Sequence, residues 1–168
     1  MRTADEIIID EVAYSSKWHA HSVKNKKGVA LERIDPDAAT QDAANWTSAS
    51  ETVGYGTPGY QNSQYKDASS GGATGIEPPV WIEESGSYTV SYLLDRPGYS
   101  CRAFVFNTSG LRVADISNHE LLGISGKITW SGVANNGSPL QTGVYIFYAE
   151  IYHPEGTVKR FKKAFLIR

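Results

Sequence analysis

Apolar and polar residues alternate along much of the second half of the chain. The clearest case places Tyr88, Val90, Tyr92 and Leu94 at every second position. A period of two residues is typical of a β-strand with one face toward a core. The same reasoning predicts strands over Tyr99–Phe106, Leu111–Ile116, Lys127–Trp130, Val144–Tyr152 and Thr157–Ile167.

Turn sequences separate these stretches, as at Asp95-Arg96-Pro97-Gly98 and His153-Pro154-Glu155-Gly156. With an edge strand near Val80–Ile82, about seven strands are expected, the number of an immunoglobulin-like β-sandwich. The run Val144–Tyr152 is long and apolar, so we expect it in the middle of a sheet, buried on both sides. The predicted fold class is therefore all-β.

The first 65 residues are less regular. Glu6–Tyr14 and Val29–Ile34 are strand candidates, although Ile7 to Ile9 follow one another without alternation. Residues 66–79 are rich in Gly, Ser and Pro and predict a linker. We therefore divide the chain into a smaller β-rich, loop-rich segment (1–65), this linker (66–79) and the sandwich (80–168).

Composition narrows the function classes. The formal net charge is −2 and 20% of residues are charged, so no basic field favours nucleic acid as a partner. No apolar run reaches the roughly 18 residues of a membrane span, and residues 1–6 lack the apolar core of a signal peptide.

The lone Cys101 cannot form an internal disulfide. Its place in mid-strand predicts a buried, inert thiol.

His19 and His21, beside Trp18, are the only clustered imidazoles. On a strand they would share a face, and Asp10 or Glu11 would have to supply a third metal ligand. Two nitrogens do not make a zinc site, so we favour ordinary loop histidines next to a packed Trp18. No metal or cofactor is predicted.

Catalytic motifs are equally absent from the sequence. There is no Gly-x-Ser-x-Gly elbow, and Gly71-Gly72 lacks the flanking strand and helix of a phosphate loop. Glu83 and Glu84 are adjacent, which places them on opposite faces of a strand. We expect no enzyme; the alternative would need polar groups from distant loops to meet in one pocket.

The last predicted strand is basic. Lys159, Arg160, Lys162 and Lys163 flank Phe161. We favour a protective role, because lysines keep an edge strand from pairing with other sheets. The alternative is contact with a phosphate or an anionic glycan. A purely structural role is expected of Trp130, Gly132, Asn136, Gly137, Gly143 and Tyr145.

Residues 9–64 resemble the closing part of bacterial lamin-tail domains. The residues that carry the resemblance are Leu31-Glu32-Arg33-Ile34-Asp35-Pro36, Asn45-Trp46 and Thr57-Pro58-Gly59, in this order. A complete lamin-tail domain is an immunoglobulin-like sandwich about twice this length. The resemblance therefore implies that its opening strands lie upstream of Met1.

Residues 88–168 are similar to the immunoglobulin-like domain of the flagellar hook-capping protein. The matching residues are Phe106 to Val113, Trp130-Ser131-Gly132, Asn136-Gly137 and Gly143-Val144-Tyr145. This resemblance implies a place at the C-terminus of an exported protein of Bacteroidetes. Relatives often carry an acidic, calcium-loop-like segment before the first strand. Residues 80–86 depart from it and hold too few oxygens for calcium.

These observations predict a non-catalytic accessory, structural or adhesion-type module at the C-terminus of an exported bacterial cell-surface protein. Its expected partner is another protein, the cell envelope or a glycan. The alternative is a carbohydrate-binding module that stacks sugars on exposed rings. Its candidate rings are Trp18, Trp46, Tyr55, Tyr60 and Trp81.

Overall fold

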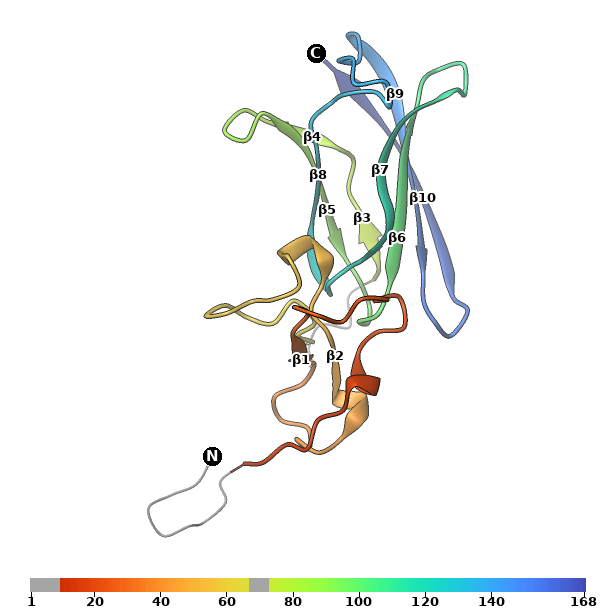
Figure 1. The fold of residues 1–168 in the computed structure, drawn as a ribbon. Coiled ribbons are helices and arrows are strands. Elements are labelled where there is room, and N and C mark those ends of the chain that lie inside the picture. The colour runs from red at the N-terminus through yellow and green to blue at the C-terminus, as the bar shows by residue number, and fades with distance from the viewer. Residues whose placement is uncertain (1–9, 67–72) are drawn as a thin grey trace.

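A computed structural model describes residues 10–66 and 73–168 of the chain. Its second half is a sandwich of two antiparallel sheets (Figure 1). The strands are β3 (Gly75–Ile76), β4 (Val80–Ile82), β5 (Ser87–Leu93), β6 (Ser100–Phe106), β7 (Arg112–Leu121), β8 (Ser125–Trp130), β9 (Gly143–Tyr152) and β10 (Val158–Ile167). Each strand predicted between residues 80 and 168 is present.

One sheet has the order β10-β9-β6-β7. In the other sheet, β8 pairs with one side of β5, and both β3 and β4 pair with the other side. β3 and β4 thus form one edge strand that Pro78 and Pro79 interrupt, since proline cannot donate to a ladder. Counted this way the sandwich has about seven strands, which confirms the predicted fold class.

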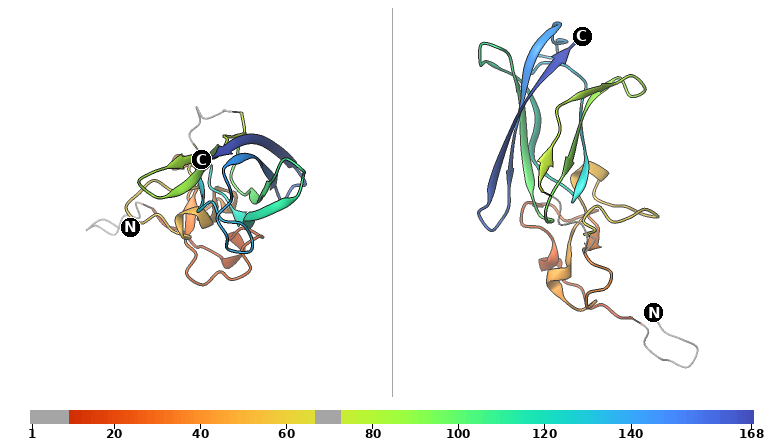
Figure 2. Two further views of the ribbon diagram at one scale, coloured as in Figure 1. Left: turned by 90° about the horizontal axis from the view of Figure 1, so that it is seen from above. Right: turned by 180° about the vertical axis from the view of Figure 1, so that it is seen from behind.

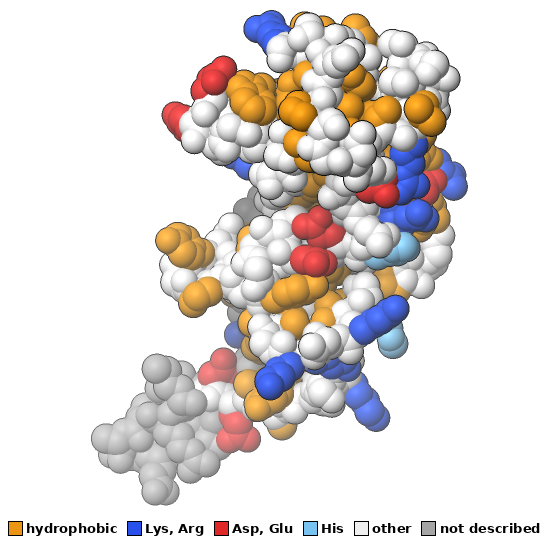
Figure 3. All heavy atoms as spheres, turned by 45° about the horizontal axis from the view of Figure 1, so that its top comes forward, with side chains coloured by type: hydrophobic (Ala, Val, Ile, Leu, Met, Phe, Trp, Pro, Cys, Tyr) orange, Lys and Arg blue, Asp and Glu red, His pale blue; other side chains and the backbone are white. Residues whose placement is uncertain are grey.

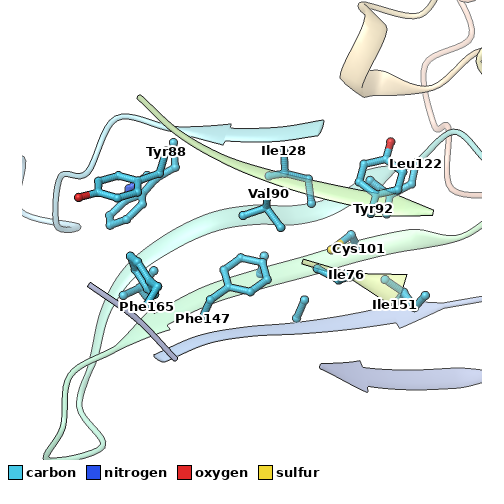
Figure 4. Close-up of a cluster of buried hydrophobic side chains, with 14 of the residues drawn as sticks. Ile76, Tyr88, Val90, Tyr92, Cys101, Leu122, Ile128, Phe147, Ile151 and Phe165 are labelled. Atoms are coloured by element: carbon cyan, nitrogen blue, oxygen red, sulfur yellow. The ribbon is translucent and has the colours of Figure 1, made fainter. Parts of the chain in front are cut away.

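The core lies between the two sheets (Figure 4). Tyr88, Val90 and Tyr92 of β5 point toward Phe147 and Ile151 of β9, and all five side chains are buried. These residues are the apolar half of each alternating strand, so the pattern places them inward. Burial of this apolar surface is the main force that holds the two sheets together.

Two details differ from the sequence prediction. β9 is central, but only one of its faces is buried, with Phe147 inward and Val144 53% exposed. Its outward tyrosines are amphipathic and tolerate partial exposure, so an apolar run did not mean burial on both sides. Within the predicted linker 66–79, residues 67–72 lie outside the described part. Gly75–Ile76 instead form β3, because the Ile76 side chain fills the core.

The N-terminal segment, residues 10–66, has little regular structure. It contains β1 (Leu31–Arg33) and β2 (Trp46–Ser48), which pair antiparallel. Three single-turn 3₁₀ helices complete it: η1 (Ser16–Trp18), η2 (Ala43–Asn45) and η3 (Glu51–Val53). β1 confirms the candidate at 29–34. In residues 10–66 and 73–168 no helix has the length and apolarity that crossing a membrane requires.

The strand predicted at Glu6–Tyr14 is wrong over its described part, because residues 10–14 form no strand; residues 6–9 lie outside the described range. Val12 and Tyr14 are exposed. Three consecutive isoleucines give no period of two, so neither face of a strand is selected.

The N-terminal segment packs against one end of the sandwich, which we call the proximal end (Figures 1 and 2). The fully buried Gln64 donates from its side-chain amide to the carbonyls of Ser48 and Leu122. Leu122 and Ile124 belong to the β7–β8 connection, and the Ile124 N–H donates to the Ser63 carbonyl at 2.8 Å. The chain thus covers the proximal end of its own sandwich.

Candidate functional site

The opposite end of the sandwich, which carries the C-terminus, is hollowed. We call it the distal end, and its hollow the distal groove, of about 670 Å³. Hydrophobic side chains gather over this end of the molecule (Figure 3). The groove lies between the edge strand β4 and the last residues of β10. It is lined by Pro79, Val80, Trp81, Glu83, Tyr88, Ser131, Gly132, Pro139, Leu140, Leu166, Ile167 and Arg168.

Trp81 forms the exposed wall of the groove. It pairs in register with Tyr88, so both side chains lie on the inner face of their sheet. Their rings meet edge to face at 5.1 Å, and Tyr88 in turn contacts the rings of Trp130 and Phe165. Trp81 remains 41% exposed. A tryptophan held this way offers a rigid apolar surface to a ligand.

The floor of the groove comes from residues 131–140, which follow β8. Their tip is a turn at Asn136-Gly137, closed by the Gly137 N–H donating to the Ala134 carbonyl. Gly132 has φ +81°, and a Cβ there would lie 3.2 Å from the Tyr88 ring. Only glycine adopts this conformation without strain and lets the backbone approach the ring.

Glu83 and Arg168 are the only ionisable side chains in the lining apart from the phenol of Tyr88. Glu83 and Glu84 lie in the turn after β4, not on a strand, which corrects the expected placement on opposite strand faces. The lining contains no His, Cys or Lys side chain that could act as nucleophile or base. The lining exposes polar and apolar surface in equal measure, which suits a binding surface that combines ring contacts with hydrogen bonds.

The basic residues of β10 run toward this groove. β10 is an edge strand, as predicted. Lys159 forms an ion pair with Asp95 at 2.9 Å, and Arg160 one with Glu150 at 2.7 Å. Lys162 and Lys163 form no ion pair with any described residue. The four cations therefore differ, and only the last two are available to an external anion.

A second, smaller hollow of about 320 Å³ lies in the N-terminal segment. It is lined by Val12, Tyr14, His19, Val29, Leu31 and Trp46. His19 Nδ1 lies 2.9 Å from the Ser48 hydroxyl, and burial together with nearby Lys26 lowers the pKa of His19. Within the described ranges no group of three or more His, Cys, Asp or Glu side chains is placed to hold a metal ion.

Cys101 is fully buried in β6, as expected, and burial raises the pKa of its thiol to about 12. The thiolate is the reactive form, so this cysteine is unreactive in the folded chain.

The five rings proposed for sugar stacking do not form one platform. Trp18 and Trp46 stack on each other in the N-terminal segment, with 6.1 Å between ring centroids. Tyr55 is half-buried, and Tyr60 is 84% exposed in a loop. Of the five, only Trp81 lines the distal groove.

Sequence reasoning missed Leu140 and Leu166 as parts of the site. Leu166 lies on the outer face of β10, beside Val144 of β9, and is 49% exposed. The signal was present, because residues 164–167 are uncharged whereas residues 159–163 hold four cations. Leu140 gave no such signal, since its position depends on the fold of residues 131–140.

No protein-family model matches the sequence, and no curated protein matches it significantly. Among solved structures, the chain is similar to FlgD from P. aeruginosa, with a TM-score of 0.40 and 18% identity over 51% of this chain and 65% of that one. It is also similar to PorZ, an essential bacterial surface component of the type-IX secretion system of Porphyromonas gingivalis. That match has a TM-score of 0.36 and 17% identity, and covers 65% of this chain and 13% of PorZ.

The chain thus spans less than two thirds of either protein. FlgD is a hook-capping protein, the class of protein that the sequence of residues 88–168 resembles. The lamin-tail resemblance of residues 9–64 and the place at a C-terminus stay predictions.

Proposed function

We propose that this chain is a non-catalytic binding module of an exported bacterial protein, and that the distal groove is its contact surface. The observation that carries the proposal is Trp81, a 41% exposed ring held rigidly against the buried Tyr88. Val80 and Leu166 are also exposed around this groove, and a contiguous apolar patch of this kind marks an interaction site on a soluble domain. The exported location belongs to the proposal through the resemblance of residues 88–168.

The composition of the groove supports binding rather than catalysis. Apolar side chains from four separate stretches meet there, and besides the Tyr88 phenol the lining holds only two ionisable side chains, Glu83 and Arg168. Aromatic anchors in such hollows contribute most of the binding free energy of an interface. The partner classes remain those expected from the sequence: another protein, the cell envelope or a glycan.

A direct test selects ligands on the intact chain from a phage-displayed random peptide library, with a glycan array in parallel. Trp81→Ala is expected to weaken selected ligands at least about 30-fold, the typical effect of removing an aromatic anchor. Tyr60→Ala is the matched control, since Tyr60 is 84% exposed in the N-terminal segment. Ligands that bind Trp81→Ala as tightly as the unchanged chain would contradict the proposal.

Carbohydrate binding is the second candidate. One observation favours it: the exposed Trp81 ring beside Tyr88 could stack on the apolar face of a sugar. This candidate predicts glycan-array hits that disappear in Trp81→Ala. Hits that survive that substitution, or only peptide ligands, would count against it.

A further inference from the structure

β10 presents a free strand edge beside the distal groove. It spans ten residues and pairs with β9 on one side only. Along such an edge, alternate residues leave their N–H and C=O groups without a partner in the sheet. These backbone groups can pair with one more strand.

The two halves of this edge differ in charge. Residues 159–163 carry Lys159, Arg160, Lys162 and Lys163, a device that discourages edge pairing. Residues 164–167, Ala-Phe-Leu-Ile, carry no charge. Leu166 is 49% exposed on this half. The charges that discourage pairing with another strand are therefore missing from the part of β10 that lines the distal groove.

The groove continues this unprotected half. Leu166 and Ile167 belong to its lining, together with Trp81 of the opposite sheet edge. Side chains on one face of a strand added to β10 would enter the space between the two sheets. There they would meet Trp81 and Leu140. Backbone pairing and side-chain burial would thus act on the same ligand.

We propose that the edge of β10 binds an extended peptide segment of a partner protein. Its alternating apolar residues would lie beside residues 164–167, and its acidic residues beside Lys162 and Lys163. The proposal rests on the proposed function and names the partner class that the groove receives.

The charges of Lys162 and Lys163 are the reason to expect acidic residues in the bound peptide. Lys159 and Arg160 already have carboxylate partners in Asp95 and Glu150. Lys162 and Lys163 have none among the described residues, and Lys162 lies in register with Tyr148, which bears no charge. An acidic stretch would satisfy both lysines and would favour one alignment along the strand.

The row of unpaired backbone groups favours a peptide over a glycan. A sugar could stack on Trp81 but would not pair with the free backbone N–H and C=O groups along the edge of β10. A peptide strand uses both, together with the two lysines. A glycan ligand is therefore an outcome that the test can reveal.

The probes are synthetic peptides that join an acidic half to an alternating Thr-Val-Thr-Ile-Thr-Val half, made in both orders along the chain. One control replaces the acidic residues with lysine, and another replaces the threonines with proline to remove backbone donors. Binding to the intact chain is measured by calorimetry. A Kd on the order of 10 µM is expected for one order of the acidic peptide. The proline control should bind at least about 10-fold more weakly.

Substitutions locate the peptide. Leu166→Lys extends the protective charges into the open half and should weaken binding at least about 10-fold. Leu111→Lys is the matched control: Leu111 is 64% exposed in the β6–β7 turn, and the affinity should stay within about twofold. The double change Lys162→Glu and Lys163→Glu should reverse the preference from the acidic to the lysine peptide.

The results separate this inference from the proposed function. If peptides or glycans bind and depend on Trp81, but neither the prolines nor Leu166→Lys matters, the groove binds without strand addition and this inference is wrong. Sedimentation that shows dimers dissolved by Leu166→Lys would make a second copy the occupant, and would also overturn it. Loss of the proline-sensitive affinity in Leu166→Lys, together with the reversed preference, supports it.

Discussion

The two ends of the sandwich are closed in different ways. At the proximal end, the N-terminal segment covers the core, and polar groups such as the buried Gln64 amide fix the contact. At the distal end, Trp81 and Leu166 remain 41% and 49% exposed. The same two sheets are therefore covered at one end by the chain itself and end at the other in an open groove with exposed rings and aliphatic side chains.

A buried carboxylate, that of Glu32, holds in shape the part of the N-terminal segment that covers the proximal end. Glu32, 3% exposed, accepts hydrogen bonds from the hydroxyls of Thr57 and Ser63 at 2.6 and 2.7 Å and from the Gln64 N–H. These bonds shape residues 57–64, which contact the β7–β8 connection. The distal groove has no comparable polar network. Hydrogen bonds within the chain fix the proximal cover, whereas no such network fills the distal groove.

The largest expected effect contrasts two tryptophans near the groove. Trp130 is 9% exposed and Trp81 is 41% exposed. Trp130→Ala should lower the free energy of unfolding by about 4 kcal/mol, because it leaves a cavity in the core. Trp81→Ala should lower it by only about 1 kcal/mol. Urea unfolding followed by circular dichroism measures both, and equal losses would mean that Trp81 is a core residue.

Removal of the Glu32 carboxylate should lower the free energy of unfolding by about 3 kcal/mol, since Glu32→Ala leaves the buried Gln64 N–H and the half-buried hydroxyls of Thr57 and Ser63 without this acceptor. Glu155→Ala is the control: Glu155 is exposed and contacts Arg96 at the surface, so a loss below about 1 kcal/mol is expected. Thermal unfolding compares the two variants. A Glu32→Ala chain as stable as the control would show that the polar network does not hold the proximal cover.

A substitution at Gly123 tests how closely the N-terminal segment packs against the β7–β8 connection. A Cβ at this position would lie 2.5 Å from the Ser63 carbonyl oxygen. Gly123→Ala should therefore destabilise the chain by about 2 kcal/mol and speed proteolysis of residues 10–66. At Gly75 the nearest atom would be 4.0 Å away, so Gly75→Ala should change stability by less than about 0.5 kcal/mol. Identical protease resistance in both variants would contradict the close packing.

The smallest expected effect is the pH-dependent stability that Glu150 of β9 contributes by binding Arg160 of β10. Hydrogen bonds from Tyr152, Arg160 and Tyr148 lower the pKa of the Glu150 carboxyl from 4.5 to about 2. A lowered folded-state pKa stabilises the chain above pH 4.5, and this contribution is lost as the pH falls toward 2. Because solvent screens the group, we expect a loss of about 1 kcal/mol.

Urea midpoints of the unchanged chain and of Glu150→Gln, measured from pH 6 to pH 2, test this expectation. The difference between the two should shrink as the pH falls. A difference that stays constant across this range would show that Glu150 does not hold β10 through its charge.

The sequence predicted the sandwich well because its strands follow one simple rule. Tyr88, Val90 and Tyr92 alternate with polar residues, and burial selects the face that they form. The strand predicted at Glu6–Tyr14 did not follow this rule, and its described part, residues 10–14, forms no strand. The rule misjudged β9, because Tyr148 and Tyr152 are apolar enough to read as buried yet lie on the outer face.

The candidate site was only partly predictable. Trp81 and the charges of β10 could be named from their local sequence. The groove itself depends on residues 131–140 folding against Tyr88, and on β4 lying near the end of β10. Such contacts between distant stretches leave no local pattern. The same holds for Gln64, whose partners Ser48 and Leu122 are separated from it by 16 and 58 positions.

Amide hydrogen exchange on the intact chain, with and without the acidic-apolar peptide, tests the central claim most directly. The account predicts slower exchange at Val80–Ile82 and at residues 164–167 in the presence of the peptide, with no change in residues 48–64 at the proximal end. Protection confined to the N-terminal segment, or equal protection by the proline-substituted peptide, would contradict it.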